Sequence, residues 1–128
     1  MARRVYAAIN AGDLEAFVSQ VDPDVEFRSL IAEAEGKTYR GHDGVREWWH
    51  EVAEALGGID FRVQEIRPVG ADGILTRILV KVEVGGVPVE QLMWQAARVG
   101  ERGPFWWWTF RTEDEAVAEI ERRQRAER

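Results

Sequence analysis

The sequence contains no cysteine, which excludes disulfide bonds, thiolate catalysis and cysteine-bound zinc. It also lacks any apolar run close to the roughly 20 residues that a membrane-spanning helix needs. Basic residues are in the minority, and the net charge of −6 disfavours a general surface for nucleic acids or anionic membranes. We therefore expect neither of these partners, and the absence of cysteine favours a cytoplasmic location.

The length of 128 residues suits a single domain covering residues 1–128. Such a chain buries about two-thirds of the surface that its unfolded form exposes, so it needs no disulfide or metal to fold. The first residues lead directly into an amphipathic segment and do not form the apolar core of a signal peptide. We expect one hydrophobic core, built without a cofactor.

Apolar residues recur at helical spacing in the first half of the chain and alternate with polar residues in the second half. The segments with helical spacing are residues 5–11, 14–21 and 45–56. The segments with strand-like alternation are residues 59–67, 74–84, 87–99 and 105–111, and a short strand is predicted over 25–30. Residues 31–41 are predicted to form a loop, and Thr112 is predicted to cap a last helix. This order predicts an α+β fold, with the N-terminal helices packed in the concave face of a curled, mainly antiparallel sheet.

Two adjacent glycines, Gly85 and Gly86, predict a tight hairpin between the second and third long strands. The hairpin places Lys81 opposite Glu90, Leu79 opposite Leu92, and Arg77 opposite Trp94, all favourable cross-strand pairs. If residues 100–103 form the next turn, Gln95 lies opposite Trp108 and Met93 lies opposite Phe110. These pairs fix the face on which each side chain is expected.

The strand at residues 105–110 is aromatic on both faces, because successive side chains of a strand point to opposite sides. Trp106, Trp108 and Phe110 are assigned to the concave face, and Trp107 to the outer face. An outer apolar patch of this size is rarely left in contact with water. We therefore predict a homodimer through the outer sheet face, formed by Leu79, Leu92, Trp94 and Trp107.

Two glutamines, Gln91 and Gln95, interrupt the predicted concave face, which is otherwise almost entirely apolar. A buried amide without a partner costs about 1–3 kcal/mol, so each must find a hydrogen-bond partner. One interpretation is that they hold a carbonyl or enol oxygen of a ligand. The other is that they bond each other, Thr76 or buried water.

Four segments of the sequence resemble the nuclear transport factor two-like superfamily, and within it the SnoaL-like, polyketide-cyclase-type domains. These segments are VYAAINAGDLE at 5–15, DVEF at 24–27, YRGHDGV at 39–45 and WWTF at 107–110. The resemblance implies a cone-shaped α+β barrel, a pocket between the concave sheet and the helices, and frequent dimers. Members include ketosteroid isomerase, limonene epoxide hydrolase, aldol-type cyclases and non-enzymatic modules, so the fold alone does not give the function.

The catalytic residues of these relatives are not matched in this sequence. The resemblance to ketosteroid isomerase places Val5 at its tyrosine, Ser29 at its aspartate base and Gln95 at its protonated acid. Tyr6 is one residue away from the tyrosine position. The strands after Gly73 contain no aspartate for the chemistry of an epoxide hydrolase or a SnoaL-type cyclase. Whether the chain is an enzyme is therefore left open.

His42 is the candidate general acid or base, because a histidine titrates close to neutral pH and it precedes the predicted helix at 45–56. A role as a loop or capping residue is the alternative. His42 and His50 lie eight residues apart without matching carboxylates, so no metal site is predicted.

The sequence thus predicts that the chain binds a small, mostly apolar carbonyl compound, such as an aromatic or polyketide-like one, in the cone. Proton-transfer, isomerase or cyclase activity would extend that function. The predicted ligand-binding residues are Gln91, Gln95, Ser29, Trp49, Trp106, Trp108, Met93 and Phe110. The alternative is a non-catalytic module for dimerisation or ligand sensing.

Overall fold

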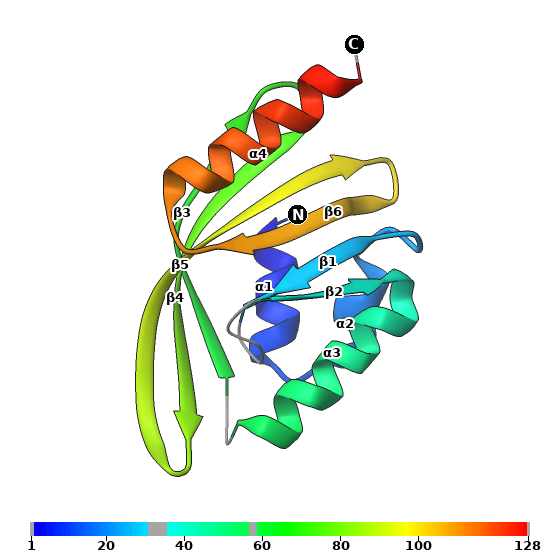
Figure 1. Cartoon of the computed structure of the whole chain (residues 1–128). Helices are drawn as coiled ribbons and strands as arrows, with labels where there is room; N and C mark the ends of the chain where they lie inside the picture. Colours follow the sequence, from blue (N-terminus) through cyan, green and yellow to red (C-terminus); the bar gives the residue numbers. More distant parts are fainter. Residues whose placement is uncertain (1, 31–35, 57–58, 128) are drawn as a thin grey trace.

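A computed structural model of the chain describes residues 2–30, 36–56 and 59–127, and shows a curled six-stranded sheet with helices on both sides (Figure 1). The helices are α1 (Ala2–Asn10), α2 (Leu14–Ser19), α3 (Gly41–Ala55) and α4 (Glu113–Ala126). The strands are β1 (Glu26–Ser29), β2 (Lys37–Arg40), β3 (Ile59–Val69), β4 (Gly73–Val84), β5 (Val87–Gly100) and β6 (Gly103–Phe110). Their order is β2-β1-β6-β5-β4-β3, with β1 and β6 parallel and all other neighbours antiparallel.

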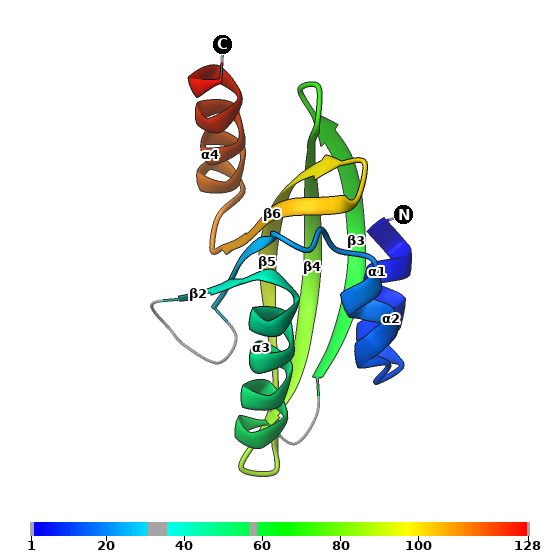
Figure 2. The same ribbon diagram turned by 90° about the vertical axis from the view of Figure 1, so that its right-hand side faces the viewer.

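The three N-terminal helices occupy the hollow of the sheet, and α4 lies on its other side (Figure 1). The view turned by 90° shows α4 well apart from α1, α2 and α3 (Figure 2). This arrangement confirms the predicted cone-shaped α+β fold. In the rest of this article, the inner face of the sheet is the one that packs on α1–α3, and the outer face is the other one.

Local sequence signals account for the starts of α2 and α4. The side chain of Asp13 accepts a hydrogen bond from the backbone N–H of Ala16, 3.1 Å away, and so caps α2. Thr112 caps α4 by accepting from the N–H of Glu115 at 3.2 Å, and its hydroxyl donates to the Glu115 carboxylate. The cap predicted at Thr112 for the last helix is therefore present.

The prediction of a loop over residues 31–41 is wrong at its second half, because residues 37–40 form β2. This edge strand pairs with β1 and buries only Tyr39, while Lys37 and Arg40 form ion pairs at the surface. A strand with one apolar residue among four has no alternating pattern to detect. Residues 31–35 of the predicted loop lie outside the described residues.

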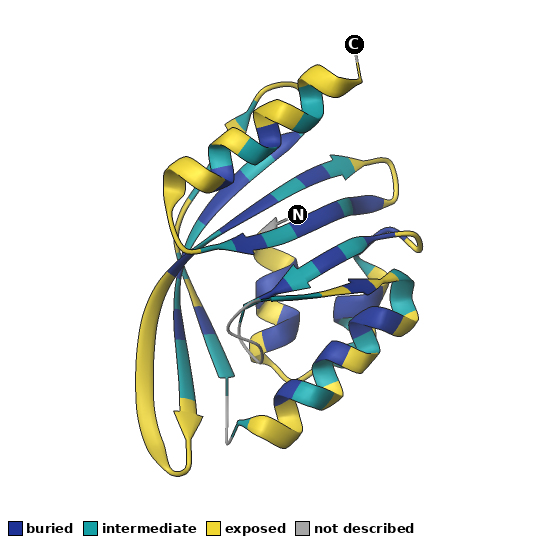
Figure 3. Ribbon diagram, viewed as in Figure 1, coloured by how far each residue is buried: buried dark blue, intermediate teal, exposed yellow. Residues whose placement is uncertain are grey.

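The hairpin between β4 and β5 has the predicted register. Lys81 pairs with Glu90, Leu79 with Leu92, and Arg77 with Trp94, and the Lys81 ammonium lies 3.2 Å from the Glu90 carboxylate. The end of the hairpin extends beyond the helices and is exposed (Figure 3). Gln91 lies on this exposed part, so the prediction that it lines the interior is wrong.

The aromatic side chains of β6 alternate as predicted, but their faces are reversed. Trp107, predicted on the outer face, is 4% exposed and packs inside against the rings of Tyr6, Phe17 and Phe27, with centroids 5.3–5.9 Å away. Trp106, Trp108 and Phe110, predicted inside, belong to a second apolar cluster on the outer face, with Ala116 and Ile120 of α4.

A β-bulge causes this reversal. Val99 pairs with Pro104 as the sequence predicts, but the register shifts by one residue between Val99 and Arg98. Beyond the bulge Gln95 lies opposite Thr109 instead of Trp108. Since a one-residue shift moves every following side chain to the other face, the whole aromatic set of β6 changes sides.

The predicted dimer surface is correspondingly smaller. Trp107 is enclosed by the helices and cannot belong to it, and Trp94 is half-buried beside the outer cluster that α4 covers. Leu92, 37% exposed, and the half-buried Leu79 remain on the outer face of the hairpin. The apolar outer face is therefore covered in large part by α4 of the same chain.

Candidate functional site

A row of buried polar side chains crosses the inner face of the sheet. Thr76 of β4 lies opposite Gln95 of β5, which lies opposite Thr109 of β6. Arg28 of β1 pairs with Trp108 of the parallel strand β6. The next residue of β1, Ser29, therefore lies beside the next residue of β6, Thr109, and continues the row. All four residues are at most 3% exposed, so an otherwise apolar interior holds a continuous polar row.

Tyr6 of α1 reaches this row from the helical side. Its hydroxyl donates a hydrogen bond to Oε1 of Gln95, and Nε2 of Gln95 donates to Oγ1 of Thr109 at 3.1 Å. The ring of Tyr6 meets the rings of Phe61 and Trp107 edge-on, at 5.9 and 5.8 Å between centroids. Gln95 is thus inside as predicted, and its amide is satisfied by the protein itself.

Burial raises the pKa of the Tyr6 hydroxyl far above its usual range, and a hydrogen bond from Thr76 offsets only part of this effect. Tyr6 is therefore a neutral hydrogen-bond donor throughout the physiological pH range. It cannot act as a base there. It can hold an oxygen atom in place, which here belongs to Gln95.

A small cavity adjoins the polar row near the start of α1. Its volume is about 30 Å³, and Tyr6, Thr76, Gln95 and Trp107 contribute to its wall. This space suits an ordered water molecule with polar partners. It is far too small for a polyketide or a steroid, so the row does not face a ligand-sized cavity at this end.

A larger cavity, which we call the α1–α3 cavity, lies between the end of α1, the second half of α3 and the start of β3. Its volume is about 260 Å³. The wall is mainly apolar and consists of Ile9, Asn10, Gly12, Trp48, Trp49, Val52, Ala53, Leu56 and Ile59. Ligand sites typically combine such an apolar wall with a few polar groups.

Asn10 supplies the side-chain amide of this cavity and is held in place by β3. Its Nδ2 donates to the carbonyl of Phe61, and its Oδ1 accepts from the N–H of the same residue, both at 2.8 Å. The amide thus pairs with the free edge of β3 as a neighbouring strand would. One N–H of Nδ2 remains available after these bonds.

The structure brings only some of the predicted ligand-binding residues together. Gln95 and Ser29 share the polar row, and Met93 is buried on the same face, two residues from Gln95. Trp49 lines the α1–α3 cavity. Gln91 is exposed on the hairpin, and Trp106, Trp108 and Phe110 lie on the outer face, because of the β-bulge described above.

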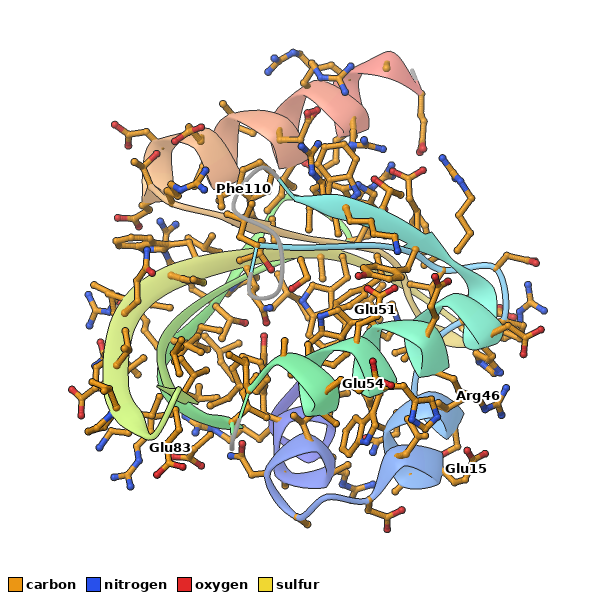
Figure 4. All side chains as sticks on the ribbon, turned by 60° about the horizontal axis from the view of Figure 1, so that its bottom comes forward. Glu15, Arg46, Glu51, Glu54, Glu83 and Phe110 are labelled. Carbon is orange, nitrogen blue, oxygen red and sulfur yellow. The ribbon has the colours of Figure 1, made fainter. Side chains whose placement is uncertain are left out.

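His42 occupies the first turn of α3, and one nitrogen of its ring lies 2.8 Å from the backbone carbonyl of Val21. Trp49 follows seven residues later, about 10 Å further along the helix axis. The ring therefore anchors α3 to the segment that follows α2, and it does not line either cavity. The nearby ion pair of Glu15 and Arg46, with nitrogen and oxygen 3.1 Å apart, joins α2 to α3 (Figure 4).

Sequence reasoning missed an ionic cluster between β2 and α3. The hydroxyl of Tyr39 donates to Glu51, and the Lys37 ammonium lies 2.8 Å from the other oxygen of that carboxylate. Burial, followed by the bond to Glu51, raises the pKa of Tyr39 above its usual range, and Lys37 lowers the pKa of Glu51. The sequence signal for this cluster was the two-residue spacing of Lys37 and Tyr39, which places both side chains on one face of β2, a strand that was not predicted.

The described part of the chain contains no group of three or more acidic, histidine or cysteine side chains placed to hold a metal ion. None of its helices is long and apolar enough to cross a membrane.

The curled sheet around three helices, with a buried polar row on its inner face, defines a nuclear transport factor two-like cone. A family model for the SnoaL-like domain matches residues 2–120, so the chain belongs to the SnoaL-like family. No curated protein matches the chain.

Solved structures agree with this assignment at the level of the fold. TerC co-crystallised with polyporic acid has a TM-score of 0.77 and 20% identity, with 91% of this chain and 95% of that one covered. A putative polyketide cyclase from Sinorhizobium meliloti has a TM-score of 0.70 and 18% identity, with 85% of this chain and 92% of that one covered. RV0760c from Mycobacterium tuberculosis, in complex with estradiol-17beta-hemisuccinate, has a TM-score of 0.72 and 16% identity, with 88% of this chain and 92% of that one covered.

The structure predicts that the Gln95→Leu variant is less stable by about 1–3 kcal/mol in its free energy of unfolding, because the hydroxyls of Tyr6 and Thr109 each lose a buried partner. Chemical denaturation measures this loss. Adding Tyr6→Phe to Gln95→Leu should cost less than the sum of the two single changes. The exposed Gln91→Leu is the matched control and should stay within about 0.5 kcal/mol of the wild type. Strict additivity of the two changes would contradict the hydrogen bond.

Stability should also fall with rising pH from about pH 10, where the tyrosines of the unfolded chain begin to ionise. Because the pKa of Tyr6 is raised in the folded state, the folded protein binds more protons there, and its contribution to stability is complete below pH 10 and lost above it. Denaturant unfolding between pH 8 and 11 should give a shallower decline for Tyr6→Phe than for the wild type. Parallel declines would show that Tyr6 ionises freely in the folded protein.

Proposed function

We propose that this SnoaL-like protein binds a small, mostly apolar carbonyl compound, and that the α1–α3 cavity is the binding site. The observation that carries the proposal is the combination of a cavity of about 260 Å³ with two indole rings and five aliphatic side chains in its wall. Burial of an apolar ligand surface in such a cavity is the main source of affinity. The small cavity at the polar row has no comparable room.

The chemistry of the wall favours an aromatic or polyketide-like ligand. Flat rings pack well against indoles, and Trp48 and Trp49 both border the cavity. A ligand carbonyl has one candidate donor in the wall, the remaining N–H of the Asn10 amide. Two related folds were crystallised with polyporic acid and a hemisuccinate ester of estradiol, which agrees with this ligand class.

Binding without turnover receives more support than proton transfer. The residues named for the wall of the α1–α3 cavity include no carboxylate, imidazole or amine. Gln95 and Ser29 stand where a ketosteroid isomerase carries its acid and its base, and Gln95 bonds Tyr6 and Thr109. His42 bonds the backbone carbonyl of Val21 instead of facing a cavity. The proposed role is therefore that of a ligand carrier or sensor.

Titration with a panel of aromatic ketones and quinones should change the tryptophan fluorescence in a saturable way. Trp49→Ala removes one wall of the cavity and should weaken binding about tenfold or more, through lost apolar contact. Trp94→Ala is the matched control, since Trp94 is a half-buried tryptophan on the outer face. Equal affinity of the Trp49→Ala variant and the wild type, or no saturable response to any compound, would sink the proposal.

We further propose that a second copy of the chain covers the outer face of the hairpin. Leu92, 37% exposed, and its cross-strand neighbour Leu79 form the apolar centre of this surface. The pair of Lys81 and Glu90 borders it, and Trp94 continues it towards α4. This is the part of the predicted homodimer surface that the fold leaves uncovered.

Leu92→Glu should convert the dimer to a monomer, because each interface would have to bury two added carboxylates. Sedimentation velocity measures the change. Ala118→Glu, on an exposed position of α4, adds the same charge away from the hairpin and should leave the dimer intact. A wild type that sediments as a monomer at high micromolar concentration would refute this interface.

A further inference from the structure

The inner face of the β4–β5 hairpin carries valines that the helices do not cover. Val84, Val87 and Val89 are 50%, 60% and 41% exposed. They point to the same side, because Val84 pairs with Val87, and Val89 pairs with the half-buried Val82, two residues before Val84. We call these four residues the valine face. A contiguous exposed apolar patch of this kind usually marks a place of contact.

The valine face continues the wall of the α1–α3 cavity. Ile59 of β3 belongs to that wall and pairs with Val82, which in turn pairs with Val89. Residues that pair across antiparallel strands point to the same face, so these three side chains form one apolar row across β3, β4 and β5. Ile59 and Val82 also pack against the same core cluster. A molecule that leaves the cavity past Ile59 along the sheet therefore meets the valine face next.

The charges of the hairpin lie on its other face. Lys81 and Glu90 pair with each other there, and Glu83 has the same parity as Lys81. Glu83 is the one charged residue within 82–89, so the valine face itself carries no charge. Figure 4 looks at this end of the molecule, with the hairpin on one side and the turn of α3 that carries Glu54 on the other. The sheet curls round the helices, so the valine face looks into the cone (Figure 1). It therefore suits an uncharged apolar occupant narrow enough to lie inside the cone.

We propose that the ligand of the α1–α3 cavity is elongated, with an aromatic carbonyl head inside the cavity and an unbranched alkyl tail on the valine face. This inference rests on the proposed function, because the head must occupy the α1–α3 cavity for the tail to pass Ile59. Each methylene of the tail that is fully buried raises the affinity about fourfold, and one that keeps one side in water raises it about twofold. The substrate class is thus an aryl ketone or quinone that carries an alkyl chain.

Fluorescence titration of the full chain with 2-methyl-1,4-naphthoquinone and its 2-octyl analogue tests the tail. The two compounds share one head, and the chain has no cysteine whose thiolate would add to the quinone ring. The octyl compound should bind at least about tenfold more tightly, because its additional methylenes leave water on the valine face. Equal affinities would overturn this inference and leave the proposed function intact. The absence of saturable binding by either compound would contradict the proposed function, and this inference with it.

A triple variant locates the tail. Val84→Thr, Val87→Thr and Val89→Thr together keep the branched side chains that a strand favours and replace one methyl group of each by a hydroxyl. All three positions are exposed, so the variant should fold. The ratio of its affinities for the octyl and methyl compounds should fall about fivefold or more. Glu83→Thr with Pro88→Thr, a pair on the outer face of the same hairpin, is the matched control and should keep the wild-type ratio. A wild-type ratio in the triple variant would overturn the assignment of the tail to the valine face.

Discussion

The bulge between Arg98 and Val99 determines what the inside of this protein contains. Without the bulge, the register of the Val99–Pro104 pair would continue and place Trp108 opposite Gln95 on the inner face. With the bulge, Thr109 lies opposite Gln95, so Trp107 and Thr109 take the inner positions instead. Arg98 holds the bulge from the outer side, with its guanidinium bound to Asp72 at 2.7 Å and to Glu127 beyond α4 at 2.6 Å. The N–H of Val99 also bonds the carbonyl of Asp72. Buried charges need such complete pairing, so the bulge and the docking of α4 are linked through one side chain.

The polar row follows directly from this register. Only the shifted pairing places Thr109 beside Gln95, and only then does a single level of the inner face carry Thr76, Gln95 and Thr109 in line. Tyr6 completes the row by donating to Gln95. A closed set of bonds of this kind stabilises a unique arrangement of the core but leaves few groups for a ligand. Gln95, which the resemblance to ketosteroid isomerase places at the protonated acid of that enzyme, is thus part of a set of bonds within the protein.

Patterns that depend on nearest neighbours in the sequence could be predicted, and patterns that depend on distant pairing could not. The cap at Thr112 and the tight hairpin at Gly85 and Gly86 are local signals and were predicted correctly. The face of Trp107 depends on a bulge at Arg98, whose guanidinium bonds Asp72, 26 residues earlier in the chain. The inner position of Gln95 was predictable because it lies within the hairpin, before the bulge acts. Gln91 shares that parity but lies where the helices no longer cover the hairpin.

The two sides of the sheet differ in the kind of polar groups that they bury and in how these groups are paired. On the inner face the amide of Gln95 forms neutral hydrogen bonds with the hydroxyls of Tyr6 and Thr109. On the outer face, the indole N–H groups of Trp106 and Trp108 are buried without acceptors among the described residues, as is that of Trp48 on the inner side. The guanidinium of Arg123, which stacks on both outer indoles, lies 3.8 and 3.6 Å from the carboxylates of Glu26 and Glu119. Because a buried donor without an acceptor costs free energy, the layer between β6 and α4 is less completely satisfied than the polar row, whose bonds specify one arrangement of the core.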